Sequence, residues 1–221
     1  MEVVVRTISD QVIDVLRERI LTGRMAPDVP IRQDIVAQEL GISKIPLREA
    51  LARLEQEGLL VSHANRGYFV RAMSRDELEE IFAIRLKLEP NAVAAGAAAA
   101  NDAQRRTAIA ALANFKAEAD ISGISGGSHN RAFHIALIAP NSGRLTSDVL
   151  TRLHVLADRY VCKHLEPLGR ASRADQEHDE ILEAWLARDK KVVAALTKQH
   201  IQGVLSDLRR VLGSKPATVA E

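Results

Sequence analysis

Residues 40–58 read LGISKIPLREALARLEQEG, and this stretch decides the fold. Gly41 ends one helix, because glycine tolerates the left-handed conformation that follows a helix. Ser43 caps a second helix, and Pro46 lies in its first turn, where the missing N–H costs nothing. The apolar stripe of this second helix, spaced as one helical face, consists of Leu47, Ala50, Leu51 and Leu54. Two helices joined by so tight a turn are typical of a helix-turn-helix.

The flanking sequence completes a winged helix-turn-helix over about residues 8–72. A first helix is predicted at residues 9–22, with Ser9 as its cap, and a short one at residues 32–40. Two short strands are predicted at residues 59–62 and 68–71, joined by a turn that contains glycine. The predicted order is therefore helix, helix, turn, helix and hairpin.

The case for DNA binding depends on where charges lie, because residues 1–73 hold ten basic and ten acidic side chains. Arg48 lies one turn into the second helix of the motif, where it can pair with guanine O6 and N7. Ser43 and Lys44 suit phosphate, and Arg66 at the hairpin turn suits phosphate or the minor groove. The full set expected to contact DNA is Arg32, Ser43, Lys44, Ile45, Arg48, Arg53, Asn65, Arg66 and Gly67.

After residue 73 the pattern is helical almost to the end, so the sequence divides into residues 1–73 and a helical domain at residues 74–221. Helices are predicted near residues 75–100, 103–120, 127–138, 143–165, 173–188 and 190–212. The fold class is thus mainly α. We find no signal peptide and no apolar run long enough for a membrane span, so we expect a cytoplasmic protein. The one cysteine, Cys162, is interpreted as a small buried apolar residue.

Several of these stretches, in order, closely resemble the GntR family of bacterial regulators: Ile31-Arg32-Gln33, residues 40–51, Leu54-Glu55, Gly58-Leu59, Arg66-Gly67 and Val70. The remainder resembles the all-helical FCD domain of the FadR-type subfamily at residues 85–89 (RLKLE), Phe133-His134, His178 and His200. The resemblance implies a homodimer that binds a palindromic site in double-stranded DNA. It also implies a small carboxylic or sugar acid that binds in the helical domain and changes the affinity for DNA.

The chain departs from the family where many members have Arg-Thr and this chain has Lys44-Ile45. Lysine lacks the planar fork of arginine. Ile45 cannot donate a hydrogen bond, although it can contact a thymine methyl. The operator sequence is therefore left open.

Three histidines, His134, His178 and His200, fall on three different predicted helices, and Asn130 shares a helical face with His134. A helical bundle can bring such residues together, and three imidazoles with an oxygen ligand suit Zn²⁺, Ni²⁺ or Mn²⁺. The resemblance implies the same site, because many FCD domains bind a metal through an Asp and three His. Asn130 stands at the Asp position and brings no charge, which lowers the expected affinity. A metal-free pocket in which these histidines bind an anion directly is the alternative.

Arg85 and Glu89 are spaced as a helical pair, and two readings are open: a surface ion pair, or an Arg85 that binds the carboxylate of the effector. The function indicated by the whole sequence is an effector-responsive repressor. A metalloenzyme with an accessory DNA-binding module is a second hypothesis, although the sequence has no His-Glu-x-x-His motif. A constitutive architectural DNA binder is a third, and it leaves about 140 residues of helical bundle without a role.

Overall fold

The computed structural model describes residues 7–122, 127–165 and 171–213, and it divides the chain into two compact units. Unit 1 is Met1–Met73 and unit 2 is Ser74–Glu221. Helices dominate both units, with one two-stranded sheet, so the predicted mainly-α class is confirmed. Among the described residues, no helix has the length and apolar character needed to cross a membrane.

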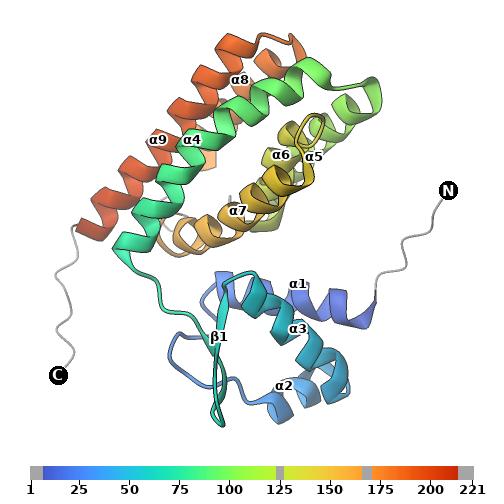
Figure 1. The fold of residues 1–221 in the computed structure, drawn as a ribbon, viewed down its shortest axis with the longest axis vertical. Helices are drawn as coiled ribbons and strands as arrows, with labels where there is room; N and C mark the ends of the chain where they lie inside the picture. Colours follow the sequence, from blue (N-terminus) through green and yellow to red (C-terminus); the bar gives the residue numbers. More distant parts are fainter. Residues whose placement is uncertain (1–6, 123–126, 166–170, 214–221) are drawn as a thin grey trace. The chain divides into compact units, whose positions relative to one another are not determined.

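Unit 1 has the predicted order of elements (Figure 1). Its elements are α1 (Ile8–Leu21), α2 (Gln33–Leu40), α3 (Lys44–Gln56), β1 (Leu60–His63) and β2 (Gly67–Val70). The strands are antiparallel, in a register that runs from Leu60 opposite Val70 to His63 opposite Gly67. The predicted stripe of α3 forms much of the core, since Leu47, Ala50, Leu51 and Leu54 are all fully buried.

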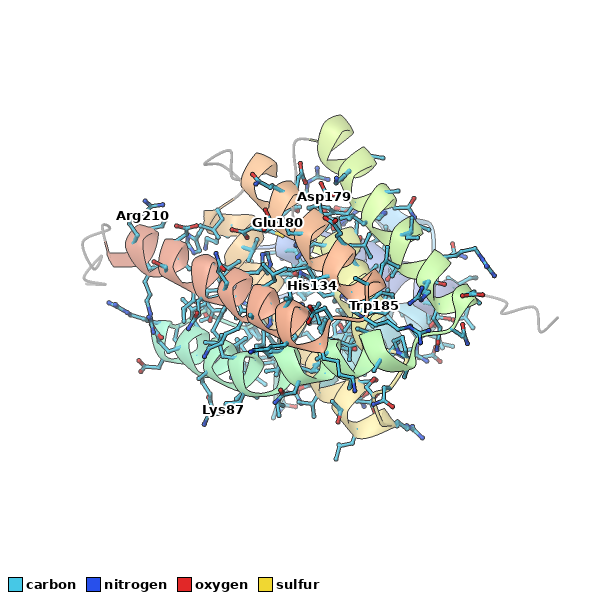
Figure 2. All side chains as sticks on the ribbon, turned by 90° about the horizontal axis from the view of Figure 1, so that it is seen from above. Lys87, His134, Asp179, Glu180, Trp185 and Arg210 are labelled. Carbon is cyan, nitrogen blue, oxygen red and sulfur yellow. The ribbon has the colours of Figure 1, made fainter. Side chains whose placement is uncertain are left out.

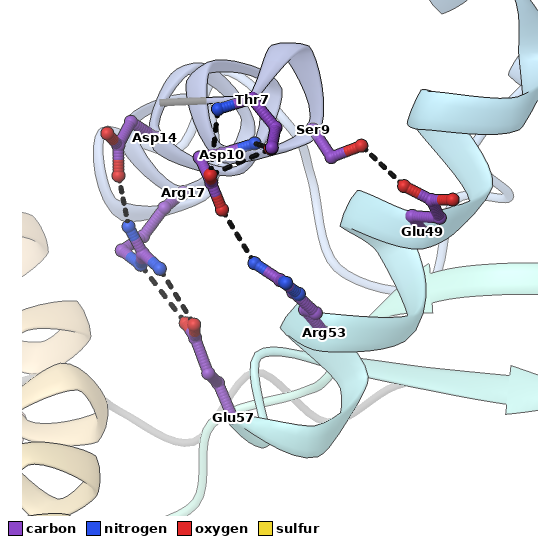
Figure 3. Close-up of polar contacts among 8 residues, drawn as sticks. All are labelled: Thr7, Ser9, Asp10, Asp14, Arg17, Glu49, Arg53 and Glu57. Atoms are coloured by element: carbon purple, nitrogen blue, oxygen red, sulfur yellow. Dashed lines mark hydrogen bonds and ion pairs between the residues drawn. The ribbon is translucent and has the colours of Figure 1, made fainter. Parts of the chain in front are cut away.

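The start of α1 differs from the prediction, because Thr7 and not Ser9 is its cap. The Thr7 hydroxyl accepts a hydrogen bond from the Asp10 N–H at 3.1 Å, and the Asp10 carboxylate accepts one from the Thr7 N–H at 3.0 Å. Ser9 is buried and donates to Glu49 of α3 at 2.6 Å (Figure 3). The sequence prediction was wrong because a serine that caps a helix and one that joins two helices have the same local context.

Polar contacts also hold α1 against α3. The guanidinium of Arg17 donates twice to the Glu57 carboxylate, at 3.0 and 2.7 Å (Figure 3). Arg53 of α3 donates to Asp10 of α1 at 2.7 Å. Because Arg17 is largely shielded from solvent, its pair with Glu57 fixes the angle between the two helices more firmly than an exposed pair would.

Unit 2 is a bundle of helices whose ends lie within two residues of the predicted ones. They are α4 (Arg75–Ala99), α5 (Asp102–Ser122), α6 (Gly127–Ile138), α7 (Arg144–His164), α8 (Ala171–Leu186) and α9 (Lys190–Gly213). The two long helices α4 and α9 lie side by side (Figure 1). Residues 123–126, between α5 and α6, and residues 166–170, between α7 and α8, lie outside the described residues.

The core of unit 2 contains a close approach of α4 to α6. A Cβ atom on Gly96 would lie 2.0 Å from the carbonyl oxygen of Leu137, so no side chain fits there. The same oxygen accepts a hydrogen bond from the indole of Trp185, which is fully buried. In Figure 2, His134 and Trp185 lie among the helices, whereas Lys87 and Arg210 lie at the edge. Gly96 and Trp185 therefore join three helices at one carbonyl group.

The substitution Gly96→Ala should destabilise unit 2 by about 1–3 kcal/mol, because α4 or α6 must shift to admit the methyl group. This outcome opposes the ordinary preference of helices for alanine over glycine. Urea unfolding followed by tryptophan fluorescence measures it, since Trp185 is the one tryptophan of the chain and reports unit 2. Gly143→Ala is the control, because nothing lies within 4 Å of its Cβ position. Equal urea midpoints for both variants would contradict the close approach.

Candidate DNA-reading surface and metal centre

The exposed side of α3 carries residues predicted to contact DNA. Ser43 is the N-cap residue, and its side chain makes no capping hydrogen bond in the described structure. Lys44 and Ile45 lie on the first turn of the helix and Arg48 at the start of the second, and all three are exposed. The start of α3 therefore presents a hydroxyl, two cations and one apolar side chain to solvent.

Acidic side chains of unit 1 already pair with some of these cations. Lys44 forms an ion pair with Asp34 of α2, and Arg53 forms one with Asp10. Arg48 instead donates to the neutral amide oxygen of Gln33 at 3.3 Å. The positive charge of Arg48 is thus not neutralised by that contact, which favours it as a DNA ligand over Lys44 and Arg53.

The hairpin presents a further arginine at its turn. Asn65 and Gly67 adopt positive φ angles of 60° and 83°, which these two residue types tolerate best. Between them, Arg66 is exposed, and its guanidinium lies 5.5 Å from the centre of the Phe69 ring. That contact limits the freedom of Arg66 before any DNA is bound.

Arg32, the N-cap residue of α2, is also exposed. The residue before it, Ile31, donates its backbone N–H to the carbonyl oxygen of Tyr68 at 2.8 Å. This bond holds the start of α2 to strand β2. The structure thus places Arg32 near the hairpin, while its contact with DNA stays a prediction.

The three histidines predicted as metal ligands meet inside unit 2, from α6, α8 and α9. His134, His178 and His200 are buried, and one ring nitrogen from each lies within 4.8 Å of the others. Their ring centres are 4.8 to 5.3 Å apart. They line a cavity of about 40 Å³ together with Arg85, Asn130, Ala157, Asp158, Val161, Leu165, Ala174 and Val204.

Burial keeps two of these imidazoles neutral, as metal ligation requires. It lowers the pKa of His134 to about 4 and that of His200 to about 4, against the partial opposing effect of a neighbouring carboxylate. Nδ1 of His200 lies 2.7 Å from Oε2 of Glu177, and Nδ1 of His134 lies 3.4 Å from Oε1 of Glu89. The Glu177 carboxylate can accept a hydrogen bond from Nδ1 of His200, which leaves Nε2 of that ring with its lone pair for an ion. Nδ1 of His134 makes no hydrogen bond in the described structure.

Arg85 and Glu89 form a buried ion pair, so the interpretation of these residues as a surface ion pair is wrong. Glu89 is fully buried and accepts from Nε and Nη2 of Arg85 at 2.8 and 3.3 Å. Its Oε1 also lies 3.0 Å from Nε2 of His154, on α7. Burial alone would raise the pKa of Glu89, but the charge of Arg85, followed by the contributions of His154 and His134, holds it well below its usual value. Glu89 is therefore ionised.

Glu89, His134 and His154 also lie close enough to hold a cation, but two observations favour the other group. Arg85 already neutralises Glu89, which weakens the attraction of that carboxylate for an ion. Moreover, the cavity is lined by the three predicted histidines and by neither Glu89 nor His154. The candidate metal centre is thus the cluster of His134, His178 and His200, which we call the histidine cluster.

Two side chains near the cluster were missed from sequence. Asp158 of α7 lines the cavity and forms an ion pair with Arg131, and His154 lies one turn before it. Both are buried within a run of α7 that is buried on every side, from Leu153 to Tyr160. The sequence signal for them was a long apolar stretch of α7 that also contains charged residues. Such a stretch does not show which groups the charged residues contact.

Comparisons with known proteins agree with this architecture. The family model described as "Bacterial regulatory proteins, gntR family" matches residues 8–70, and the model "FCD domain" matches residues 80–203. The "Nta operon transcriptional regulator" of Aminobacter aminovorans is 29% identical over 180 residues, which are 80% of this chain and 82% of that protein. The "HTH-type transcriptional repressor GlaR" of Escherichia coli (strain K12) is 26% identical over 196 residues, which are 84% and 89% of the two chains.

The fold also matches solved structures. A structure described as "E. coli McbR/YncC" superposes with a TM-score of 0.75 at 21% identity, over 93% of this chain and 99% of that chain. At this identity the match shows the shared fold alone.

Acidification should destabilise unit 2 in the metal-free protein. Histidines with a folded-state pKa of about 4 gain protons mainly in the unfolded chain as pH falls from about 6.5 to about 4. The free energy of unfolding should therefore fall between pH 7 and pH 5, by up to roughly 2 kcal/mol for each such histidine. Urea unfolding followed by Trp185 fluorescence measures the change.

His200→Gln is the comparison variant, because it removes one of the two histidines whose pKa is lowered to about 4 and leaves His134. Its urea midpoint should depend less steeply on pH than that of the unchanged protein. The buried state of the histidines would be contradicted by a midpoint that stays constant or rises on acidification over this range.

Proposed function

The chain belongs to the GntR family of bacterial regulatory proteins and carries an FCD domain, and from this premise we propose that it is a repressor controlled by a small acid bound in unit 2. Its relatives are described as a transcriptional regulator and a transcriptional repressor and not as enzymes, which sets the metalloenzyme hypothesis aside. The relative GlaR is described as a repressor, which supports repression, and not activation, as the proposed effect on transcription. Such a regulator acts on the chromosome, in the cytoplasm.

In this proposal, two copies of unit 1 in a homodimer read the two halves of a palindrome in double-stranded DNA. The recognition helices of such a dimer must be one DNA turn apart, so a small change in their spacing lowers the affinity. The α3 surface carries the proposal, since Arg48 is exposed and contacts only a neutral amide among its described hydrogen bonds. Arg66 at the hairpin supplies a second contact, with a phosphate of the DNA backbone.

Unit 2 is proposed to hold Zn²⁺, Ni²⁺ or Mn²⁺ at the histidine cluster, with Asn130 as an oxygen ligand. The buried neutral rings and the Glu177 carboxylate on Nδ1 of His200 support this assignment. Once bound, the ion supplies open coordination positions for a carboxylate oxygen. Asn130 brings no charge. Among the described lining residues the one carboxylate, that of Asp158, pairs with Arg131, so we expect weaker metal affinity than an Asp at residue 130 would give.

Arg85 is proposed to bind the effector. It lines the cavity while its Nε and Nη2 donate to Glu89, which leaves Nη1 for an anion. A cavity of about 40 Å³ has room for little more than an ion and one water, so we expect it to widen around the acid. In a metal-free protein, the same histidines and Arg85 would bind the acid directly, which is the second candidate mechanism.

Arg48→Ala should weaken binding to a selected operator by about 1–3 kcal/mol and relax the sequence preference, because Arg48 is proposed to read a base. Arg66→Ala should weaken binding to all sequences more evenly, because a phosphate contact carries no sequence information. Fluorescence anisotropy at fixed salt, with operator and scrambled duplexes, measures both. Arg24→Ala, in the loop after α1, is the matched control. Unchanged operator affinity for Arg48→Ala would contradict the role given to α3.

Protein purified without a histidine tag should contain close to one equivalent of a divalent transition metal, and the double variant His134→Ala/His178→Ala should contain far less. Plasma mass spectrometry measures the content, and the buried Trp185 reports whether the variant is folded. His63→Ala removes a histidine from the hairpin of unit 1 and should leave the metal content unchanged. Equal content in the double variant and in the unchanged protein would rule out the cluster as the site.

A further inference from the structure

Ile45 is the most exposed of the large apolar side chains in the described part of unit 1. It is 70% exposed, compared with 58% for Ile8 and 56% for Val29. It is also the second residue of α3, in the turn of the helix that enters the major groove in a helix-turn-helix. An isoleucine left in water at that point has apolar surface to bury on binding.

The geometry of α3 directs Ile45 away from its own domain. At about 100° per residue, Ile45 points roughly 170° from the centre of the buried stripe formed by Leu47, Ala50, Leu51 and Leu54. Arg48 lies one turn further on, and their Cα atoms are separated by ~4.5 Å along the axis. Lys44, the other neighbour, is held by Asp34 of α2. Ile45 and Arg48 are therefore the two side chains best placed to meet base edges.

The major groove offers these two side chains different partners. Arginine pairs with O6 and N7 of guanine, whereas the thymine C5-methyl is the apolar group that distinguishes one base there. An isoleucine can neither donate nor accept a hydrogen bond, so a polar base edge set against it would be left unsatisfied. The chemistry of Ile45 thus selects a thymine methyl and disfavours a cytosine amino group at the same position.

We infer that Ile45 is a specificity-determining residue that packs on a thymine methyl next to the guanine bound by Arg48. The ~4.5 Å between the two residues along α3 is close to the ~3.4 Å step between base pairs, so each half-site should contain neighbouring T·A and G·C pairs. This inference rests on the proposed function, in which α3 reads a DNA operator, and adds which bases it reads.

The test begins with selection of an operator from a random duplex library by the full-length protein. Each thymine of the selected site is then replaced, one at a time, by deoxyuridine, which lacks only the methyl group. Fluorescence anisotropy at fixed salt should show one thymine in each half-site whose replacement weakens binding about fourfold, the equivalent of the ~0.8 kcal/mol expected for one buried methyl. That thymine should adjoin a guanine.

Ile45→Ala should lose this discrimination and bind the thymine and deoxyuridine duplexes equally. Ile35→Ala, which truncates a 46% exposed isoleucine of α2, should keep the fourfold difference. The inference is overturned if no thymine is sensitive, or if Ile45→Ala retains the same sensitivity as the unchanged protein. Failure of the library to enrich any sequence would overturn the proposed function as well, so the two failures are distinct.

Discussion

The carboxylate of Glu89 is the constraint around which the interior of unit 2 is arranged. A fully buried charge is tolerated only when hydrogen bonds and an opposite charge compensate for its lost hydration. Glu89 receives both, from Arg85 on its own helix and from His154 on α7. The same carboxylate lies 3.4 Å from Nδ1 of His134, on α6. One buried charge thus lies where side chains of three helices meet, beside the histidine cluster.

Charge is balanced differently on α3 of unit 1, where cations at the surface pair with acidic side chains that solvent can reach. Asp34 and Asp10 pair with Lys44 and Arg53, two of the cations on α3. Such pairs contribute little stability, but they compete with phosphate for the same cations. No carboxylate competes with phosphate for Arg48 among its described contacts, because its hydrogen-bond partner there is the neutral amide of Gln33. Affinity for DNA is therefore expected to depend on few ionic contacts and, more than usual, on contacts with base edges.

Periodicity in the sequence predicted every helix and both strands of the described chain to within two residues, because the apolar stripes are regular. The cluster of His134, His178 and His200 was expected mainly from the family resemblance, since spacing alone cannot show that three helices meet. Contacts between residues far apart in the sequence could not be predicted from it. The bond from Ser9 to Glu49 spans forty residues, and Glu177 reaches His200 only after α8 packs on α9. Such pairs exist only in the folded chain.

Binding of an acid in unit 2 is proposed to control the affinity of unit 1 for DNA, and a titration of operator binding measures this coupling. The dissociation constant of the full-length protein for its selected operator is measured by anisotropy while small carboxylic and sugar acids are added in the presence of Zn²⁺. At least one acid should change this constant by about fivefold or more, as allosteric coupling typically does. The His134→Ala/His178→Ala variant should show no such change. An acid that binds unit 2 and leaves the operator affinity unchanged would rule out control of DNA binding by unit 2.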